Sequence, residues 1–120
     1  MTLNYRDPRP IYEQLIDMLR RMILTGAIAT GERLPSVREL AAELAVNPNT
    51  IQRAYRELEA QGFVVSIGGK GSFAAPLEDV GEKHKKELWD KLHAAAAELH
   101  QLGESKESIL QNMKEVLPDD

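Results

Sequence analysis

The chain has 120 residues, of which 42% are apolar and 28% charged, which predicts one ordinary domain with an additional segment. It contains no cysteine, and this excludes a disulfide scaffold, a thiol nucleophile and any metal site built on thiolates. No apolar run reaches the roughly 18 residues of a membrane span, and the N-terminus lacks a basic segment followed by an apolar core. We therefore expect a soluble, cytoplasmic protein that contacts no membrane.

The formal net charge of -4 is unevenly distributed along the chain. Residues 1–76 carry nine Lys and Arg against eight Asp and Glu, whereas residues 77–120 carry six against eleven. Every arginine precedes residue 57 and every lysine lies at residue 70 or later. Arginine suits bidentate contacts with bases and phosphates, while lysine among glutamates is typical of a solvated helix face. The composition thus predicts a domain over 1–76 and a separate region over 77–120.

The first half of the chain predicts a helix, a glycine-containing loop and a second helix. Apolar residues recur at helical spacing over 10–25, where Pro10 suits the first helical position, and Gly26 provides a stop signal. Ser36 and Glu39 form a capping-box pattern, which predicts a short second helix over 36–44.

A third helix and a hairpin are expected to follow. Asn47 suits the N-cap position and Pro48 the first turn, so this helix is expected to extend to Gln61. Two helices joined by so short a turn form a helix-turn-helix. After Gly62 the apolar period becomes alternating, with Phe63, Val65 and Ile67 on one side, and the glycine-rich stretch 68–71 turns the chain back. This pattern predicts a β-hairpin, the wing of a winged helix.

The acidic region predicts two amphipathic helices after a polar linker that follows Pro76. The first covers 81–102, where apolar residues step by four and three along one face, and the second begins at Ser105. Neither helix makes a core alone, so we expect both to form a dimer interface. The residues expected in this interface are Leu88, Trp89, Leu92, Leu99, Leu102, Ile109 and Met113. The expected fold is mainly α with a small β-wing, an N-terminal winged helix-turn-helix with a C-terminal two-helix dimerisation tail.

Four stretches of the head form a recognisable pattern: PIYEQL at 10–15, GERLPSVRELA at 31–41, VNPNTIQRAYREL at 46–58 and GKGSF at 69–73. In this order they resemble the GntR family of bacterial transcriptional regulators. The resemblance implies a winged helix that binds operator DNA. The short two-helix tail is similar to that of the YtrA subfamily, whose members dimerise through it and often control transporter operons.

The first turn of the third helix is where base readout is expected, because such a helix enters the major groove by its N-terminal residues. Asn49 and Gln52 suit adenine, Arg53 suits guanine, and Thr50 suits a phosphate or a thymine methyl group. A local cap hydrogen bond is the alternative for Thr50.

Further contacts are expected from the second helix, the loop before it and the wing. The resemblance implies that Arg38 reaches DNA, often at a guanine. It lies beside a helix N-terminus that favours phosphate, and a salt bridge to a glutamate is the alternative. For Arg33 a phosphate contact and a solvated loop charge both remain open. Lys70 supplies charge at the wing tip, where Gly69 either allows close approach or only makes the turn. The expected DNA-contacting set is Arg33, Ser36, Arg38, Asn47, Asn49, Thr50, Gln52, Arg53, Gly69 and Lys70.

Other classes of site find little support. The glycines of the wing lack phosphate-loop spacing. His84, His93 and His100 lack a metal-ligand pattern, and no serine has a histidine placed to activate it. We expect no enzyme activity, no metal and no cofactor. Trp89 is expected in packing, with an aromatic wall for an effector as the alternative.

The sequence therefore predicts a homodimeric regulator that binds double-stranded DNA, most simply as a repressor on an inverted-repeat operator with half-sites roughly 10 bp apart. The alternative is a winged helix that binds a protein partner without sequence-specific DNA binding. A small-molecule effector is left open; it would bind at the dimer interface or between head and tail.

Overall fold

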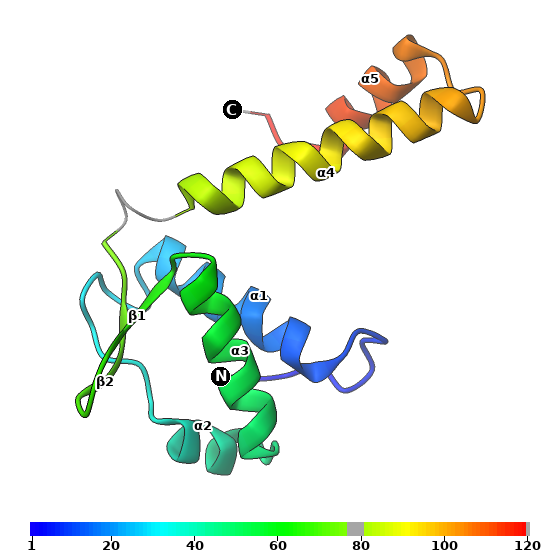
Figure 1. Ribbon diagram of the computed structural model, residues 1–120. Helices are drawn as coiled ribbons and strands as arrows, with labels where there is room; N and C mark the ends of the chain where they lie inside the picture. The colour runs from blue at the N-terminus through cyan, green and yellow to red at the C-terminus, as the bar shows by residue number, and fades with distance from the viewer. Residues whose placement is uncertain (77–80, 120) are drawn as a thin grey trace. The chain divides into compact units, whose positions relative to one another are not determined.

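The computed structural model describes residues 1–76 and 81–119, and the linker expected after Pro76 lies outside the described residues at 77–80. The elements follow the expected order, as Figure 1 shows: α1 (Ile11–Thr25), α2 (Val37–Leu44), α3 (Pro48–Ala60), β1 (Val64–Ile67), β2 (Gly71–Ala74), α4 (Glu82–Gln101) and α5 (Lys106–Val116). The chain forms two compact units, Met1–Lys83 and His84–Asp120. The fold is thus mainly helical with a two-stranded wing.

Helix α1 provides one wall of the head's core. It begins one residue later than expected, because Pro10 is extended, with a ψ of 147°, and lies at the N-cap position. The carbonyl of Pro10 accepts the Glu13 N–H at 3.1 Å. The helix ends at Gly26, whose φ of 82° is left-handed. Leu15, Leu19 and Ile23 are buried along one face, which confirms the apolar stripe that the sequence predicts.

Both helices of the helix-turn-helix begin with the N-cap residue that the sequence predicts. The Ser36 hydroxyl accepts the Glu39 N–H at 3.1 Å at the start of α2, and the Asn47 side-chain oxygen accepts the Asn49 N–H at 2.8 Å at the start of α3. Between the helices, Ala45 has a φ of 55° and is the one non-glycine residue with positive φ among the described residues. The turn is therefore a left-handed helix end followed at once by a new N-cap.

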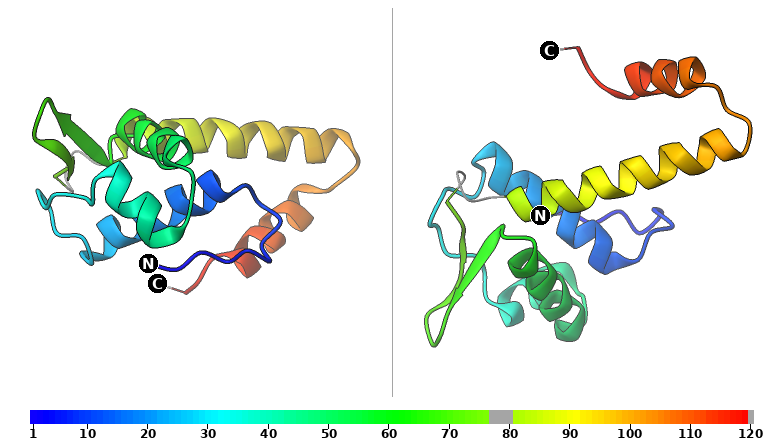
Figure 2. Two further views of the ribbon diagram at one scale, coloured as in Figure 1. Left: turned by 90° about the horizontal axis from the view of Figure 1, so that it is seen from below. Right: turned by 45° about the horizontal axis from the view of Figure 1, so that its top comes forward.

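The core of the head joins all three of its helices and the base of the wing. Figure 2 shows α1, α2 and α3 packed about one another with the hairpin extending from them. The largest fully buried side chains come from α1, α2, α3 and the loop before α2; they are Leu15, Leu19, Ile23, Leu34, Leu40, Ile51 and Leu58. This single apolar cluster therefore determines which face of α3 is exposed.

The wing is anchored at its base and exposed beyond it. Strands β1 and β2 pair in antiparallel fashion from Val64 opposite Ala74 to Ile67 opposite Gly71. The strand begins at Val64, one residue later than the sequence pattern indicates. Phe63 and Val64 are both buried, whereas Val65 and Ile67 are 44% and 45% exposed. The expected alternation therefore does not describe burial, because the hairpin leaves the core after Val64.

The second unit is a pair of helices with little interior. Ser105 caps α5 by accepting the Ser108 N–H at 3.0 Å, as the sequence predicts. No residue of α5 is buried, and Leu88, Leu99 and Leu102 of this unit are exposed by 48%, 43% and 78%. The right-hand view of Figure 2 shows α4 and α5 joined by a short connection and lying apart along most of their length. Much of the apolar surface of α4 is therefore exposed within this unit.

Among the described residues, no helix combines the length and the apolar character that crossing a membrane would need.

The left-handed backbone at Ala45 generates a prediction about stability. A side chain in this conformation destabilises the folded state by about 1–2 kcal/mol. Glycine removes this strain, but its greater freedom in the unfolded chain offsets roughly 0.4–1 kcal/mol of the gain. Ala45→Gly is therefore expected to raise the free energy of unfolding by about 0.5–1 kcal/mol, measured by urea denaturation. The matched control, Ala42→Gly on the exposed face of α2, is expected to lower it by about 1 kcal/mol. A loss of stability in Ala45→Gly as large as in Ala42→Gly would contradict this account.

Candidate nucleic-acid interface

Helix α3 has one face in the core and the other in solvent. The buried face consists of Ile51, Ala54, Tyr55 and Leu58, which belong to the core of the head. The opposite face is exposed and polar; it carries Asn49, Gln52, Arg53 and Arg56. Because these residues are three to four positions apart, they form one continuous surface along the helix. This arrangement suits a helix that inserts into a groove.

The first turn of α3 presents free side-chain donors and acceptors. Within the described part of the chain, the side chains of Asn49, Thr50 and Gln52 make no hydrogen bond. The local cap bond considered for Thr50 is therefore not formed by its hydroxyl; its N–H bonds to the Asn47 carbonyl at 2.9 Å. Asn47 itself uses its side-chain oxygen as the cap, and its amide N–H groups remain for another partner.

The start of α2 combines a helix N-terminus with an unneutralised cation. Arg38 is exposed in the first turn, and no carboxylate of the described residues lies within ion-pair distance of it. The alternative of a salt bridge to a neighbouring glutamate is therefore not realised. Ser36 accepts the cap hydrogen bond, which leaves its O–H free to donate. Both features favour an anionic partner such as a phosphate.

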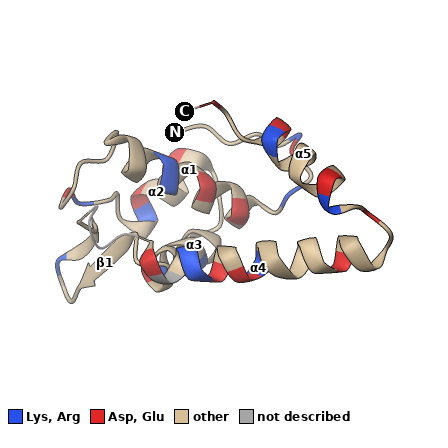
Figure 3. Cartoon of the chain, turned by 90° about the horizontal axis from the view of Figure 1, so that it is seen from above, with Lys and Arg blue, Asp and Glu red and all other residues tan. Residues whose placement is uncertain are grey.

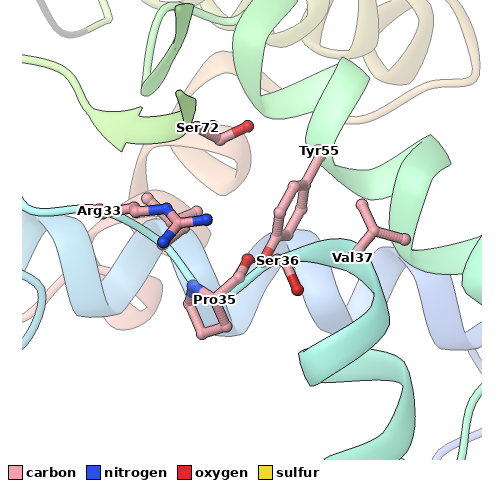
Figure 4. Close-up of a pocket in the computed structure, with 8 residues that line it drawn as sticks. Arg33, Pro35, Ser36, Val37, Tyr55 and Ser72 are labelled. Atoms are coloured by element: carbon pink, nitrogen blue, oxygen red, sulfur yellow. Dashed lines mark hydrogen bonds between the residues drawn. The ribbon is translucent and has the colours of Figure 1, made fainter. Parts of the chain in front are cut away.

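A hollow of about 150 Å³ lies between the start of α2 and the wing. Figure 4 shows its lining, with Arg33 on one side and Ser36 and Tyr55 on the other. The Tyr55 hydroxyl donates to the Pro35 carbonyl at 2.6 Å. Burial raises the pKa of the Tyr55 hydroxyl, and the negative charge of Glu39 raises it further. Tyr55 therefore stays protonated and holds the loop before α2 against α3.

The Arg33 side chain lies against Gly71 at the start of β2, where a residue with a side chain would crowd it. A Cβ at Gly71 would come within 2.9 Å of Arg33 Nε, and the φ of 115° at Gly71 also favours glycine. The loop is tied to the wing by the Leu34 N–H, which donates to the Ser72 carbonyl at 2.8 Å. Arg33 is exposed, and it forms no ion pair with the described residues. Its cation thus stands at the junction of α2 and the wing.

The wing tip is exposed and basic. Gly69 and Lys70 lie in the loop between β1 and β2, where the Lys70 N–H donates to the Ile67 carbonyl at 2.9 Å. Gly69 has a φ of 75°, so the turn itself requires its conformation. Figure 3 shows a basic residue at the end of the wing and basic and acidic residues interspersed along the helices. The surface of the head is therefore not uniformly basic, and its positive charges stand at separate positions.

Two features of this surface escaped the sequence analysis. Arg56 is exposed seven residues after Asn49, and the helical spacing of the polar residues would have indicated it. Arg53 does not extend freely: its Cζ lies 3.6 Å from the centroid of the Tyr12 ring, which comes from α1. No local pattern signals this contact, because it joins residues from two helices.

The residues expected in a dimer interface all lie in the second unit. Leu88, Trp89, Leu92, Leu99 and Leu102 are exposed by 40% to 78%, and Ile109 and Met113 are half-buried. The Trp89 ring contacts His93, with ring centroids 5.7 Å apart. Among the described residues, no three His, Asp or Glu side chains are grouped so that they could hold a metal ion.

Comparison with known proteins gives consistent matches. The model of the bacterial regulatory proteins of the gntR family matches residues 11–73. The HTH-type transcriptional repressor YtrA of Bacillus subtilis is 34% identical over 118 residues, which cover 94% of this chain and 91% of the relative. The structure of YtrA from Sulfolobus acidocaldarius, described as a GntR-family transcription factor, is 30% identical with a TM-score of 0.62, over 97% of this chain and 95% of that one.

A third match includes DNA. The crystal structure of the AraR DNA-binding domain in complex with operator ORE1 is 30% identical with a TM-score of 0.55, over 61% of this chain and 89% of that chain. The matched part of our chain is thus similar to a domain solved on its operator. Together with the winged helix-turn-helix, these matches identify a DNA-binding transcriptional regulator and not an enzyme: the chain belongs to the GntR family of bacterial regulatory proteins.

Proposed function

We propose that this protein is a cytoplasmic, homodimeric repressor that binds an inverted-repeat operator. The head, residues 1–76, reads DNA, and the tail, residues 77–120, makes the dimer. The observation that carries the proposal is the first turn of α3, where Asn49 and Gln52 are exposed and unbonded while the other face of the helix is buried. Polar side chains at such a helix start match the hydrogen-bonding edges of bases in the major groove.

The remaining groups of the head suit the phosphate backbone. Arg38 and the N-terminus of α2 favour one phosphate, Arg33 lies beside them, and Lys70 stands at the end of the wing. Contacts of this kind set affinity and register, while contacts with base edges set sequence preference. We therefore assign Asn49 and Gln52 to readout.

The exposed apolar faces of α4 and α5 support the dimer. Leu92 and Leu99 lie seven residues apart on one face of α4 and are 40% and 43% exposed. A second copy that covers this face would remove the apolar surface from water. Two-fold symmetry would then present two α3 helices about one DNA turn apart, which favours half-sites centred roughly 10 bp apart.

Repression is the simplest mode of action for such a dimer, because occupying an operator blocks access to the promoter. The Bacillus subtilis relative YtrA is named a repressor, and we extend that role to this chain. The resemblance of the tail to the YtrA subfamily makes a transporter operon our candidate target.

The readout proposal is tested by selecting binding sites from a random duplex library and measuring the affinity of variants for the selected site. Asn49→Ala and Gln52→Ala are each expected to weaken binding by roughly tenfold or more, since a good bidentate base contact contributes about 1–3 kcal/mol of discrimination. Each variant should also relax sequence preference at one position per half-site. The control is Arg21→Ala, which also removes an exposed arginine. Arg21 lies beside Arg20, which bonds to Gln61 at the end of α3 opposite the first turn. If the folded wild-type protein enriches no sequence, the DNA-reading proposal fails.

The dimer proposal is tested by placing a charge on the apolar face of α4. Leu99→Asp is expected to raise the dimer dissociation constant at least tenfold, because the new carboxylate would be buried without a partner. Ala97→Asp puts the same charge on the opposite, exposed face of α4 and should leave association unchanged. Sedimentation equilibrium measures both. A Leu99→Asp protein that dimerises as tightly as Ala97→Asp would place the interface elsewhere.

A further inference from the structure

The side chain of Arg53 is stacked on an aromatic ring from another helix. Its guanidinium carbon lies 3.6 Å from the centroid of the Tyr12 ring, the distance of a close cation–π contact. Tyr12 belongs to the first turn of α1 and is half-buried, packed against the core of the head. Arg53 is exposed. The exposed guanidinium of Arg53 is therefore held against an aromatic ring that packs on the core.

Among the described residues, no carboxylate pairs with this guanidinium. Glu57, one helical turn after Arg53, accepts a hydrogen bond from the Gln61 side chain at 3.0 Å. Glu13, next to Tyr12, is 3.4 Å from the Tyr12 hydroxyl. Arg53 forms no ion pair with any described residue. The positive charge of Arg53 is therefore positioned without being neutralised.

The stack leaves the hydrogen-bonding capacity of the guanidinium intact. A cation–π contact occupies the flat face of the group, whereas its five N–H donors point outward in the plane. These donors match two oxygens of a phosphate in a bidentate arrangement. Much of the rotamer freedom of the long side chain is already lost in the free protein, so less is lost when an anion binds.

The position of the ring also limits what Arg53 reaches. Tyr12 holds the guanidinium toward α1, at the flank of α3, while Asn49 and Gln52 remain free at the start of the helix. Bases lie along the floor of a groove and phosphates along its two edges. We propose that Tyr12 is a positioning residue that holds Arg53 as a contact to a backbone phosphate beside the groove, not to a base. The inference rests on the proposed DNA binding, and it replaces the guanine contact that the sequence suggests for Arg53.

The experiment uses the full-length protein and the duplex that the wild-type protein selects. Arg53→Ala should weaken binding about tenfold, keep the selected consensus, and reduce the slope of log affinity against log salt by about one per half-site, as expected for a lost phosphate contact. Tyr12→Leu should weaken binding several-fold with the same consensus, and Tyr12→Phe, which keeps the ring, should bind as the wild type does.

The double variant Tyr12→Leu with Arg53→Ala separates positioning from a general structural role. If Tyr12 acts through Arg53, Tyr12→Leu should have no further effect on DNA affinity once Arg53 is absent. An equal loss in both backgrounds would show that Tyr12 acts through the fold, and an altered consensus in Arg53→Ala would show that Arg53 reads a base. Either result overturns the inference while leaving operator binding in place.

A second variant keeps the test decisive if Tyr12→Leu does not fold. Arg53→Lys retains the charge but loses the planar, bidentate group, so it should recover little of the affinity lost in Arg53→Ala. Wild-type affinity in Arg53→Lys would overturn the stacked phosphate contact. A wild-type protein that selects no duplex at all would overturn the inference together with the proposed function.

Discussion

The packing of α1 against α3 is the constraint that determines what the head can present. Leu15 and Leu19 from α1 and Ile51 and Leu58 from α3 are all fully buried, and truncating a side chain of this kind typically costs about 2–5 kcal/mol. Because this face of α3 is committed to the core, its opposite face has to point into solvent. The same packing brings Tyr12 beside Arg53, so one apolar contact both exposes the polar face of α3 and positions a cation next to it.

The loop before α2 connects this helical core to the wing. Leu34 is buried, its N–H bonds to Ser72 of β2, and the Tyr55 hydroxyl of α3 bonds to the neighbouring Pro35 carbonyl. The start of α2, the middle of α3 and strand β2 of the wing are thus joined by hydrogen bonds within a few residues of Ser36. Groups proposed to contact one DNA duplex therefore belong to one rigid framework, which reduces the ordering cost of binding.

The features that were predicted correctly depend on residues close together in the sequence. Caps at Ser36, Asn47 and Ser105 and the buried stripe of α1 follow from local spacing and were found where expected. Contacts between elements were not predictable in this way: the stack of Tyr12 on Arg53 and the placement of Arg33 over Gly71 depend on how helices and strands meet. The exposure of Val65 and Ile67 was also missed, because a two-residue period does not show where a hairpin leaves the core.

The charges of the head give a physical reason for the proposed dimer. Residues 1–76 have nine basic against eight acidic residues, so bulk attraction to DNA is weak and affinity has to come from a few placed groups. One head with so few contacts would bind weakly by itself. Linking two heads makes the second binding event intramolecular, which strengthens binding without any new contact. In the proposed dimer, the acidic tail contributes apolar faces for association and adds no attraction to DNA, so selectivity is left to the paired heads.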